Sequence, residues 1–563
     1  GVQPDRYRDY QIEASLPLLE GDLIAVKNEL MLAFNELLLT AGENSDKLTV
    51  LRTMLDQLDE LIEDQERFTE VITSFKINVR ALGNWVTQVL PQPLQIDRIY
   101  IRSADTDPVI EKNGWGAQTW HELSRLYYSF VIDYNRIGNV VEQSKDTPTI
   151  TLWIGTGRDQ ANVIKSLIDE TFTNTYNIGV NVQLVDMNML LRATLAGQGP
   201  DVAIQVANTN GIAGMVLNVG NDTPVNFGIR NAVMDLTQFE DFPEVAARFA
   251  GSALVPFSFN GATYALPDTY TFPMLFYRKD ILAEIGLEVP RTWDDVKVAM
   301  SVLSKNQMEF GMLPSEQIFA MLLFQNGGKY YTNNGDRSLL DSDVAVSVFK
   351  QYCEFYTDYK LDKETSVEER FRTGECPLII ADYTLYNNLQ VSAPDILGLW
   401  DFTTVPGTVQ PDGSVSYAAS CVGLADIIMS QTEYPEACWT FLKWWTSAQT
   451  QVRYGREMES LMGASARVAT ANLEALRSLP WPIRDYQALT SQLQYVEGIP
   501  QVPGGYYSWR NVNNAFFSVT TDSSQKIKDN AAATPREELM EKVYYINAEI
   551  TYKRLEFGLP LAE

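Results

Sequence analysis

The spacing of apolar residues along the chain changes near residue 146. Before this point, apolar residues recur every three or four positions, as they do on one face of a helix. Four such runs are present, at residues 22–40, 48–62, 68–86 and 120–137. Short connections between amphipathic helices favour antiparallel packing, so residues 1–145 are predicted to form an α-helical bundle. This bundle is either a docking surface or a brace for the domain that follows.

A different pattern follows the polar linker at residues 143–149. Short apolar runs typical of strands alternate with helical periodicity, which predicts an α/β sheet with mainly parallel strands. Ligands of such sheets bind beyond the carboxyl ends of the strands. The loops at residues 155–159 and 207–211 are therefore candidate binding loops. The predicted strands are Ile150–Ile154, Val180–Val185 and Val202–Val206, with helices at Gln160–Tyr176 and Met187–Ala196 between them.

Composition narrows the classes of function. The 563 residues are too many for one hydrophobic core, so three compact units of roughly 100–200 residues each are expected. The chain carries 72 acidic and 44 basic side chains, which argues against binding to nucleic acid or to anionic lipid. His121 is the only histidine, which excludes most zinc sites and most catalysis that pairs histidine with serine or cysteine. We therefore expect neither a metal nor a cofactor, with calcium on oxygen-rich loops such as Asn333–Asp336 as the alternative for a metal.

The four cysteines form no CxxC pair, so neither a zinc ribbon nor a thioredoxin-type motif is predicted. Cys438 lies in an apolar helical run and Cys421 in a strand-like run, while Cys353 and Cys376 are isolated. Buried free thiols are the main expectation, with at least one disulfide as the alternative.

Several short motifs follow one another in a fixed order after residue 148. Two of them have a clear local meaning: Asn260-Gly261 predicts a tight hairpin turn, and Thr292 predicts a helix cap. Together the motifs resemble the extracellular solute-binding proteins of carbohydrate ABC importers, the group that includes maltose-binding protein. The resemblance covers the chain from about residue 148 to its end and leaves the helical region outside. The motifs are Ile150–Trp153, Leu195–Val202, Phe259–Pro267, Leu275–Asp280, Val289–Asp295, Phe371–Glu375 and Ala437–Trp445.

This resemblance implies an α/β two-lobed, periplasmic-binding-protein-like clamp, preceded by the helical bundle of residues 1–145. Residues 146–563 would form the solute-binding domain, with a hinge crossing between Tyr264 and Tyr277. In the family, closure of the lobes buries a ligand and presents a surface to the transporter. By the family's pattern, lobe 1 holds about residues 148–266 and 422–472, and lobe 2 holds about residues 270–418 and 475–563.

The function implied by the resemblance is that of an ABC importer's substrate-binding component. Such a protein captures a carbohydrate, with an oligosaccharide preferred here, and hands it to a membrane permease. It is expected to act as a monomer, without enzymatic activity and without nucleic acid. The implied location is extracellular, at the cell surface or periplasmic, and a lipid anchor on a segment before Gly1 would fit it.

The resemblance also implies which residues face the ligand. At the hinge, Thr271 occupies the position of a glutamate in the family, and Asp268 is the candidate replacement for that carboxylate. Tyr383 and Trp509 fall in segments where the family stacks aromatic rings on sugars, although Trp509 could instead pack in the core at the start of a helix. The remaining candidates carry groups that suit sugar hydroxyls or lie beside such groups: Arg158, Asn208, Asn210, Glu316, Tyr386 and Arg510.

Other functions stay open on the sequence alone. The departure at Thr271 allows a non-sugar solute on the same clamp, either a ferric ion bound by tyrosines or a polyamine bound by acidic residues. An acidic chain also offers carboxylate pairs of the kind that glycoside hydrolases use, although no catalytic motif is recognisable. A structural or adhesion role carried by the bundle would leave the clamp without a ligand.

We predict that residues 146–563 fold and bind ligand without the helical region, because the apolar pattern changes abruptly at residues 145–148. This fragment, expressed alone, should be soluble and should bind with the affinity of the full chain. An insoluble fragment, or a soluble one that fails to bind the full chain's ligand, would contradict the boundary.

Overall fold

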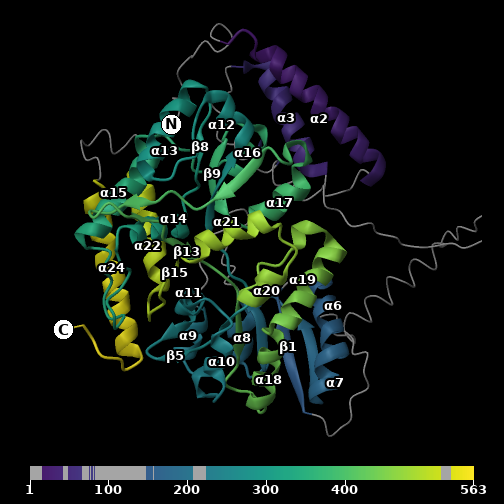
Figure 1. The fold of residues 1–563 in the computed structure, drawn as a ribbon, viewed down its shortest axis with the longest axis vertical. Helices are drawn as coiled ribbons and strands as arrows, with labels where there is room; N and C mark the ends of the chain where they lie inside the picture. Colours follow the sequence, from purple (N-terminus) through teal and green to yellow (C-terminus); the bar gives the residue numbers. More distant parts are fainter. Residues whose placement is uncertain are drawn as a thin grey trace, which may run out of the picture.

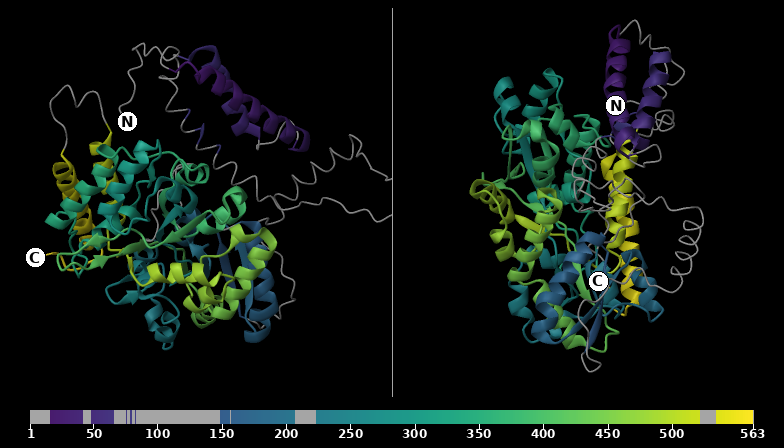
Figure 2. Two further views of the ribbon diagram at one scale, coloured as in Figure 1. Left: turned by 45° about the horizontal axis from the view of Figure 1, so that its top comes forward. Right: turned by 90° about the vertical axis from the view of Figure 1, so that its right-hand side faces the viewer.

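A computed structural model describes residues 16–41, 48–65, 148–155, 157–206, 223–521 and 534–562, together with residues 75, 78, 79 and 82 (Figure 1). Two predicted N-terminal helices are confirmed as α2 (Leu19–Ala41) and α3 (Thr49–Glu63). Their small shared core includes Leu23, Leu58 and Leu61. Figure 2 shows α2 and α3 as a pair set off from the two lobes. The helices predicted at residues 68–86 and 120–137 lie largely or wholly outside the described residues.

Lobe 1 is built on a five-stranded sheet with the order β2-β1-β3-β14-β6. Strands β1, β2 and β3 are parallel, as the alternating pattern predicted, whereas β14 is antiparallel to both β3 and β6. The strands are β1 (Thr149–Ile154), β2 (Gly179–Leu184), β3 (Val202–Val206), β6 (Leu266–Pro267) and β14 (Ala425–Ile428). Helices in this lobe include α6 (Arg158–Leu167), α7 (Thr173–Tyr176), α8 (Leu190–Leu195), α9 (Thr223–Ile229), α18 (Pro435–Trp445), α19 (Ala448–Met462) and α20 (Leu473–Ser478).

Lobe 2 is built on a four-stranded sheet with the order β10-β7-β9-β8, in which only β8 and β9 run parallel. The strands are β7 (Pro273–Arg278), β8 (Phe310–Gly311), β9 (Leu378–Asp382) and β10 (Trp400–Thr403). Its helices include α12 (Lys279–Ile285), α13 (Trp293–Lys305), α14 (Glu316–Gln325), α15 (Asp343–Thr357), α16 (Val367–Thr373), α17 (Leu385–Ser392), α21 (Ile483–Leu493), α22 (Tyr506–Thr520) and α24 (Pro535–Glu556).

Local signals in the sequence account for several of these elements. Thr292 caps α13 and forms a capping box with Asp295, as its position predicted. Asn260 and Gly261 both have positive φ, at 52° and 84°, and join strands β4 (Ser258–Phe259) and β5 (Ala262–Thr263) in the predicted hairpin. All four cysteines are buried and free, which confirms the main expectation for them. Within the part of the chain that the structure describes, no helix combines the length and the apolar character needed to cross a membrane.

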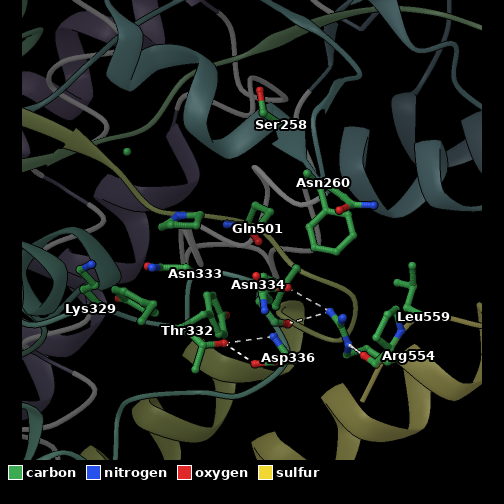
Figure 3. Close-up of a pocket in the computed structure, with 18 of the residues that line it drawn as sticks. Ser258, Asn260, Lys329, Thr332, Asn333, Asn334, Asp336, Gln501, Arg554 and Leu559 are labelled. Atoms are coloured by element: carbon green, nitrogen blue, oxygen red, sulfur yellow. Dashed lines mark hydrogen bonds between the residues drawn. The ribbon is translucent and has the colours of Figure 1, made fainter. Parts of the chain in front are cut away.

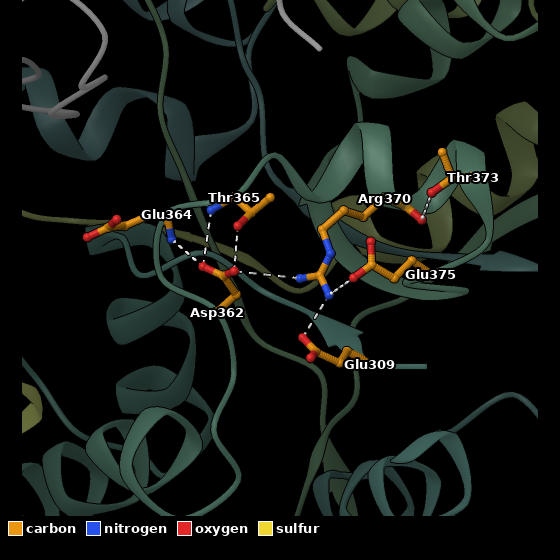
Figure 4. Close-up of polar contacts among 7 residues, drawn as sticks. All are labelled: Glu309, Asp362, Glu364, Thr365, Arg370, Thr373 and Glu375. Carbon is orange, nitrogen blue, oxygen red and sulfur yellow. Dashed lines mark hydrogen bonds and ion pairs between the residues drawn. The ribbon is translucent and has the colours of Figure 1, made fainter. Parts of the chain in front are cut away.

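An ion-pair network fixes the start of α16 against β8 in lobe 2 (Figure 4). The Arg370 guanidinium donates to Glu309 at 2.8 Å and to Glu375 at 2.6 Å, while Asp362 lies 3.9 Å away. Asp362 in turn accepts hydrogen bonds from the backbone of the following turn. Because each carboxylate reaches Arg370 from a different segment, the network acts as a brace within lobe 2 rather than as a ligand site.

The two lobes are joined where three chain segments cross side by side. Thr271 and Val422 exchange backbone hydrogen bonds of 2.9 and 3.0 Å, and Tyr270 donates its N–H to the carbonyl of Ala469 at 2.9 Å. The crossing is tight, because a Cβ added at Gly423 would lie 2.0 Å from the carbonyl oxygen of Thr269. The structure thus confirms a hinge crossing between Tyr264 and Tyr277.

A pair of buried aspartates lies on the lobe 1 side of this crossing. Asp268 is 2% exposed and accepts a hydrogen bond from the indole of Trp445 at 3.1 Å, and Asp426 is fully buried and accepts from the backbone of Gln205 at 3.0 Å. The Oδ2 atoms of both aspartates have no partner among the described residues. Burial raises the pKa of Asp268 to about 7, and burial together with the neighbouring Asp268 raises the pKa of Asp426 well above its usual value.

We predict that this pair makes folding less favourable as the pH rises. Both carboxyls keep their protons in the folded protein at a pH where the unfolded chain has released them. Their contribution to stability is therefore complete below about pH 4 and is lost as the pH rises through about 7. Asn at position 426 can keep the bond from Gln205 and donate to Asp268. Asp426→Asn should thus raise the free energy of unfolding at pH 8 by about 1–2 kcal/mol.

Urea unfolding of both proteins between pH 5 and pH 8 measures this effect. The matched control is Asp186→Asn, because Asp186 is exposed and caps a helical turn, a role that asparagine also fills. An Asp426→Asn variant less stable than the parent chain at pH 8 would refute the account of the pair.

Candidate ligand-binding site

The carboxyl ends of β8 and β9 meet at one edge of the lobe 2 sheet, close to the hinge. Asp382 is the last residue of β9, and the chain that leaves β8 leads into α14, whose first two residues are Glu316 and Gln317. The side chains of Gln317 and of Thr271 from the hinge lie beside the carboxyl of Asp382 and act to lower its pKa. A carboxylate, an amide and a hydroxyl group are thus gathered where the two lobes join.

The surroundings of Asp382 set its electrostatic state. Burial raises the pKa of this carboxyl to about 6, although the nearby polar groups of Thr271, Gln317 and two backbone N–H groups favour the ionised form. Its Oδ1 atom has no hydrogen-bond partner among the described residues. The residue is partly exposed but this oxygen is covered, so a ligand reaches it only in an arrangement of the lobes that uncovers it.

The carboxylate at the hinge comes from Asp382 and not from Asp268. Asp268 was expected to supply the carboxylate missing at Thr271, but it is 2% exposed and engaged by Trp445 inside lobe 1. The carboxylate beside Thr271 belongs to Asp382, which the sequence analysis did not select. Its one local signal was its position directly after the apolar run of residues 378–381, at the carboxyl end of a strand.

The structure places both predicted tyrosines in the protein interior. Tyr383 is 1% exposed, and its hydroxyl donates to the carbonyl of Tyr270 at 3.0 Å. Tyr386 is 5% exposed, and its hydroxyl donates to Asp485 at 2.6 Å. Their rings pack against Phe272 and Trp481, with centroid distances of 5.0 and 5.1 Å. Neither ring presents a free face for stacking in this arrangement of the lobes.

The third aromatic residue predicted to stack on a sugar is buried as well. Trp509 lies in the first turn of α22, is 7% exposed and packs in the lobe 2 core, with its ring centroid 6.4 Å from that of Phe319. This is the placement that the core-packing alternative predicted, and the stacking role has no support from it. Arg510 is exposed, and its guanidinium covers the ring of Tyr507 at 4.7 Å.

The remaining candidates are divided between the lobes. Glu316 is partly buried in lobe 2 beside Gln317, close enough to Tyr330 to help raise the pKa of that buried phenol. Arg158 is exposed in lobe 1 at the start of α6, just beyond the carboxyl end of β1. Asn208 and Asn210 lie outside the described residues. The structure therefore gathers Thr271 and Glu316 near the hinge with Asp382 and Gln317, and it buries Asp268, Tyr383, Tyr386 and Trp509.

Solved structures of similar fold cover most of the chain. A solute-binding protein of an ABC transporter from Thermotoga lettingae, bound with α-D-tagatose, has a TM-score of 0.52 and 19% identity and covers 72% of this chain and 100% of its own. A substrate-binding protein from Listeria monocytogenes in complex with cycloalternan has a TM-score of 0.53 and 18% identity and covers 74% of this chain and 100% of its own. The sugar-binding protein MalE from Xanthomonas citri has a TM-score of 0.57 and 18% identity and covers 73% of this chain and 100% of its own. These likenesses establish the two-lobed periplasmic-binding-protein-like fold.

No curated protein sequence matches the chain. The family model described as bacterial extracellular solute-binding protein matches residues 168–473, a segment that runs from just after α6 in lobe 1 through the whole lobe 2 sheet to the first residue of α20. This segment includes the hinge crossing and the polar groups around Asp382. Because it makes up more than half of the sequence, the chain belongs to the bacterial extracellular solute-binding protein family.

Proposed function

We propose that this chain captures a carbohydrate between its two lobes and delivers it to the membrane permease of an ABC importer. The observation that carries the proposal is the polar group formed by Asp382, Thr271 and Gln317 at the hinge of a two-lobed solute-binding protein. Proteins of similar fold whose structures have been solved bind tagatose, cycloalternan and maltose, which supports a sugar as the ligand. An extracellular or periplasmic location follows from the family.

The chemistry of this group fits a neutral ligand rich in hydroxyls. A carboxylate accepts two hydrogen bonds, an amide donates and accepts, and a hydroxyl does both, so together they can satisfy neighbouring hydroxyls of one sugar ring. Hydrogen bonds to the ionised Asp382 are stronger than those between neutral groups. A ligand that contacts both lobes stabilises the closed arrangement by its differential affinity for it.

The proposal contains no catalytic step and differs from two alternatives. A ferric ion or a polyamine is a cation, so the same clamp would have to surround it with anionic or phenolic side chains. A glycoside hydrolase would release shorter sugars. Sugar recovered unchanged after prolonged incubation with the protein distinguishes capture from hydrolysis.

A thermal-shift screen tests the class of ligand. The panel contains D-tagatose, maltose, maltotriose and mannotriose, with spermidine and ferric citrate for the alternatives. A sugar present at a hundred times its Kd should stabilise the protein by about 2.7 kcal/mol. A shift produced by spermidine or ferric citrate and by none of the sugars would overturn the proposal.

We predict that Asp382→Asn weakens sugar binding at least tenfold at pH 7.5, or about 1.4 kcal/mol, because it removes the charged acceptor. In the parent chain the affinity should fall as the pH is lowered through about 6, where Asp382 gains a proton. The variant should show no such pH dependence. Calorimetric titration between pH 5 and pH 8 measures both effects. Asp343→Asn is the matched control, since Asp343 lies in lobe 2 with its side chain 97% exposed.

We also predict that Trp509→Ala lowers the free energy of unfolding by about 3–5 kcal/mol in the absence of ligand, because it empties a buried site in lobe 2. Denaturant unfolding measures the loss, with Tyr544→Ala as a control at a position that is 72% exposed on α24. Unchanged stability combined with lost sugar affinity would restore the stacking role that the sequence suggested.

A further inference from the structure

A recess lies between the lobes away from the hinge site, and its lining does not include Thr271, Gln317 or Asp382. It encloses about 1030 Å³, a volume sufficient for a ligand of several rings. One wall is the tip of the β4–β5 hairpin in lobe 1, and the opposite walls are residues 328–336 and 497–502 of lobe 2 (Figure 3). We call this recess the hairpin groove.

The C-terminal residues close one side of the hairpin groove. Leu559, Pro560 and Leu561 line it after α24 has ended in lobe 2. Just before them, the ring of Phe557 lies under the guanidinium of Arg230 in lobe 1, with 5.4 Å between the guanidinium carbon and the ring centroid. The chain end therefore contacts both lobes next to the groove.

The walls are held in place by interactions that leave the lining amides unused. The buried guanidinium of Arg554 donates to the carbonyls of Asn334 and Gly335, each at 3.2 Å, and to that of Pro560 at 2.6 Å. One side chain thus ties the 328–336 loop to the C-terminal residues. Gly335 has a φ of +63° and packs so closely that an added Cβ would lie 2.6 Å from Val502. The groove is consequently formed before any ligand arrives.

Four amide side chains face this preformed space: Asn260 from lobe 1 and Asn333, Asn334 and Gln501 from lobe 2 (Figure 3). None of these amides has a side-chain hydrogen bond to another described residue. Each offers both donors and an acceptor, which is the combination that neighbouring sugar hydroxyls require.

The charged side chains of the lining give it no net preference for an ion of either sign. Lys329 and Arg554 supply two positive charges, and Asp336 and Glu497 supply two negative charges, so the lining is balanced. Phe259 adds an apolar ring surface against which the C–H face of a sugar can pack.

From this geometry we infer that the hairpin groove is a second binding site, for a neutral polyhydroxylated solute such as an oligosaccharide, and that its occupancy is coupled to the angle between the lobes. The coupling follows from the placement of the amides. Any rotation at the hinge changes the separation of Asn260 from Asn333 and Asn334, so a ligand that bridges them binds one arrangement better than the other. Coupling of this kind is reciprocal between the two sites.

Calorimetric titration with maltotriose and with mannotriose, each up to 10 mM, tests the second site. The parent chain should bind two equivalents of at least one of these sugars. In the double variant Asn333→Ala/Asn334→Ala, the affinity for the sugar in the groove should fall more than tenfold, while the affinity for the sugar at the hinge should stay unchanged. Asp382→Asn should show the reverse pattern. Gln487→Ala is the matched control, because Gln487 is an exposed amide on α21 outside both sites.

The outcomes separate this inference from the proposed function. One equivalent that disappears in the double variant and persists in Asp382→Asn supports the groove and contradicts the hinge site. One equivalent that persists in the double variant, or no binding of either sugar, overturns the groove. Both asparagines are exposed, so the melting temperature of the double variant without ligand should equal that of the parent chain.

Small-angle scattering tests the coupling. In Asp382→Asn, the sugar that fills the groove should change the radius of gyration. The triple variant Asn333→Ala/Asn334→Ala/Asp382→Asn should show no change with the same sugar. A filled groove with an unchanged radius of gyration would overturn the coupling and leave a second site that is independent of lobe closure.

Discussion

The architecture of the solute-binding domain depends on the backbone hydrogen bonds at the hinge, where the segments around Thr271, Val422 and Ala469 pass from one lobe to the other. These bonds join pieces of chain that are distant in sequence into a narrow junction. Gly423 allows this junction because a side chain there would collide with the carbonyl of Thr269. The two sheets are thereby connected through a few residues, which allows the lobes to rotate as units.

Water is largely excluded from this junction, and the effect on nearby acids explains much of its chemistry. Asp268 and Asp426 are buried on one side of it and hold their protons to higher pH than exposed carboxyls do. Asp382 lies on the other side and is only partly buried, with hydrogen-bond donors that favour its charge. At neutral pH the same residue type therefore serves as a protonated internal group in one lobe and as an ionised acceptor beside the hinge in the other. The difference arises from desolvation and from the donors within reach.

Two of the places where the described parts of the lobes meet differ in character. At the hinge, the polar groups are few, partly buried and close to an ionisable carboxylate. In the hairpin groove, the polar groups are neutral amides on a wall that Arg554 holds in shape. Both places are lined by segments that move relative to one another when the lobes rotate, so ligands bound at the two places would influence each other through the lobe angle.

The sequence by itself determined the local structure and the family. The α/β alternation, the strands near residues 150, 180 and 202, the Asn260-Gly261 turn and the Thr292 cap depend on neighbouring residues, and all are present in the structure. The order of motifs was enough for the family because it records the succession of such local elements.

Only the tertiary structure decided which side chains are accessible. Asp268, Tyr383 and Trp509 were selected by position in the chain, yet segments distant in sequence cover all three. Asp382 became a candidate only once Thr271 and Gln317 were seen beside it. Burial and desolvation depend on which distant segments pack against a residue, and the residue's neighbours in the chain do not carry that information.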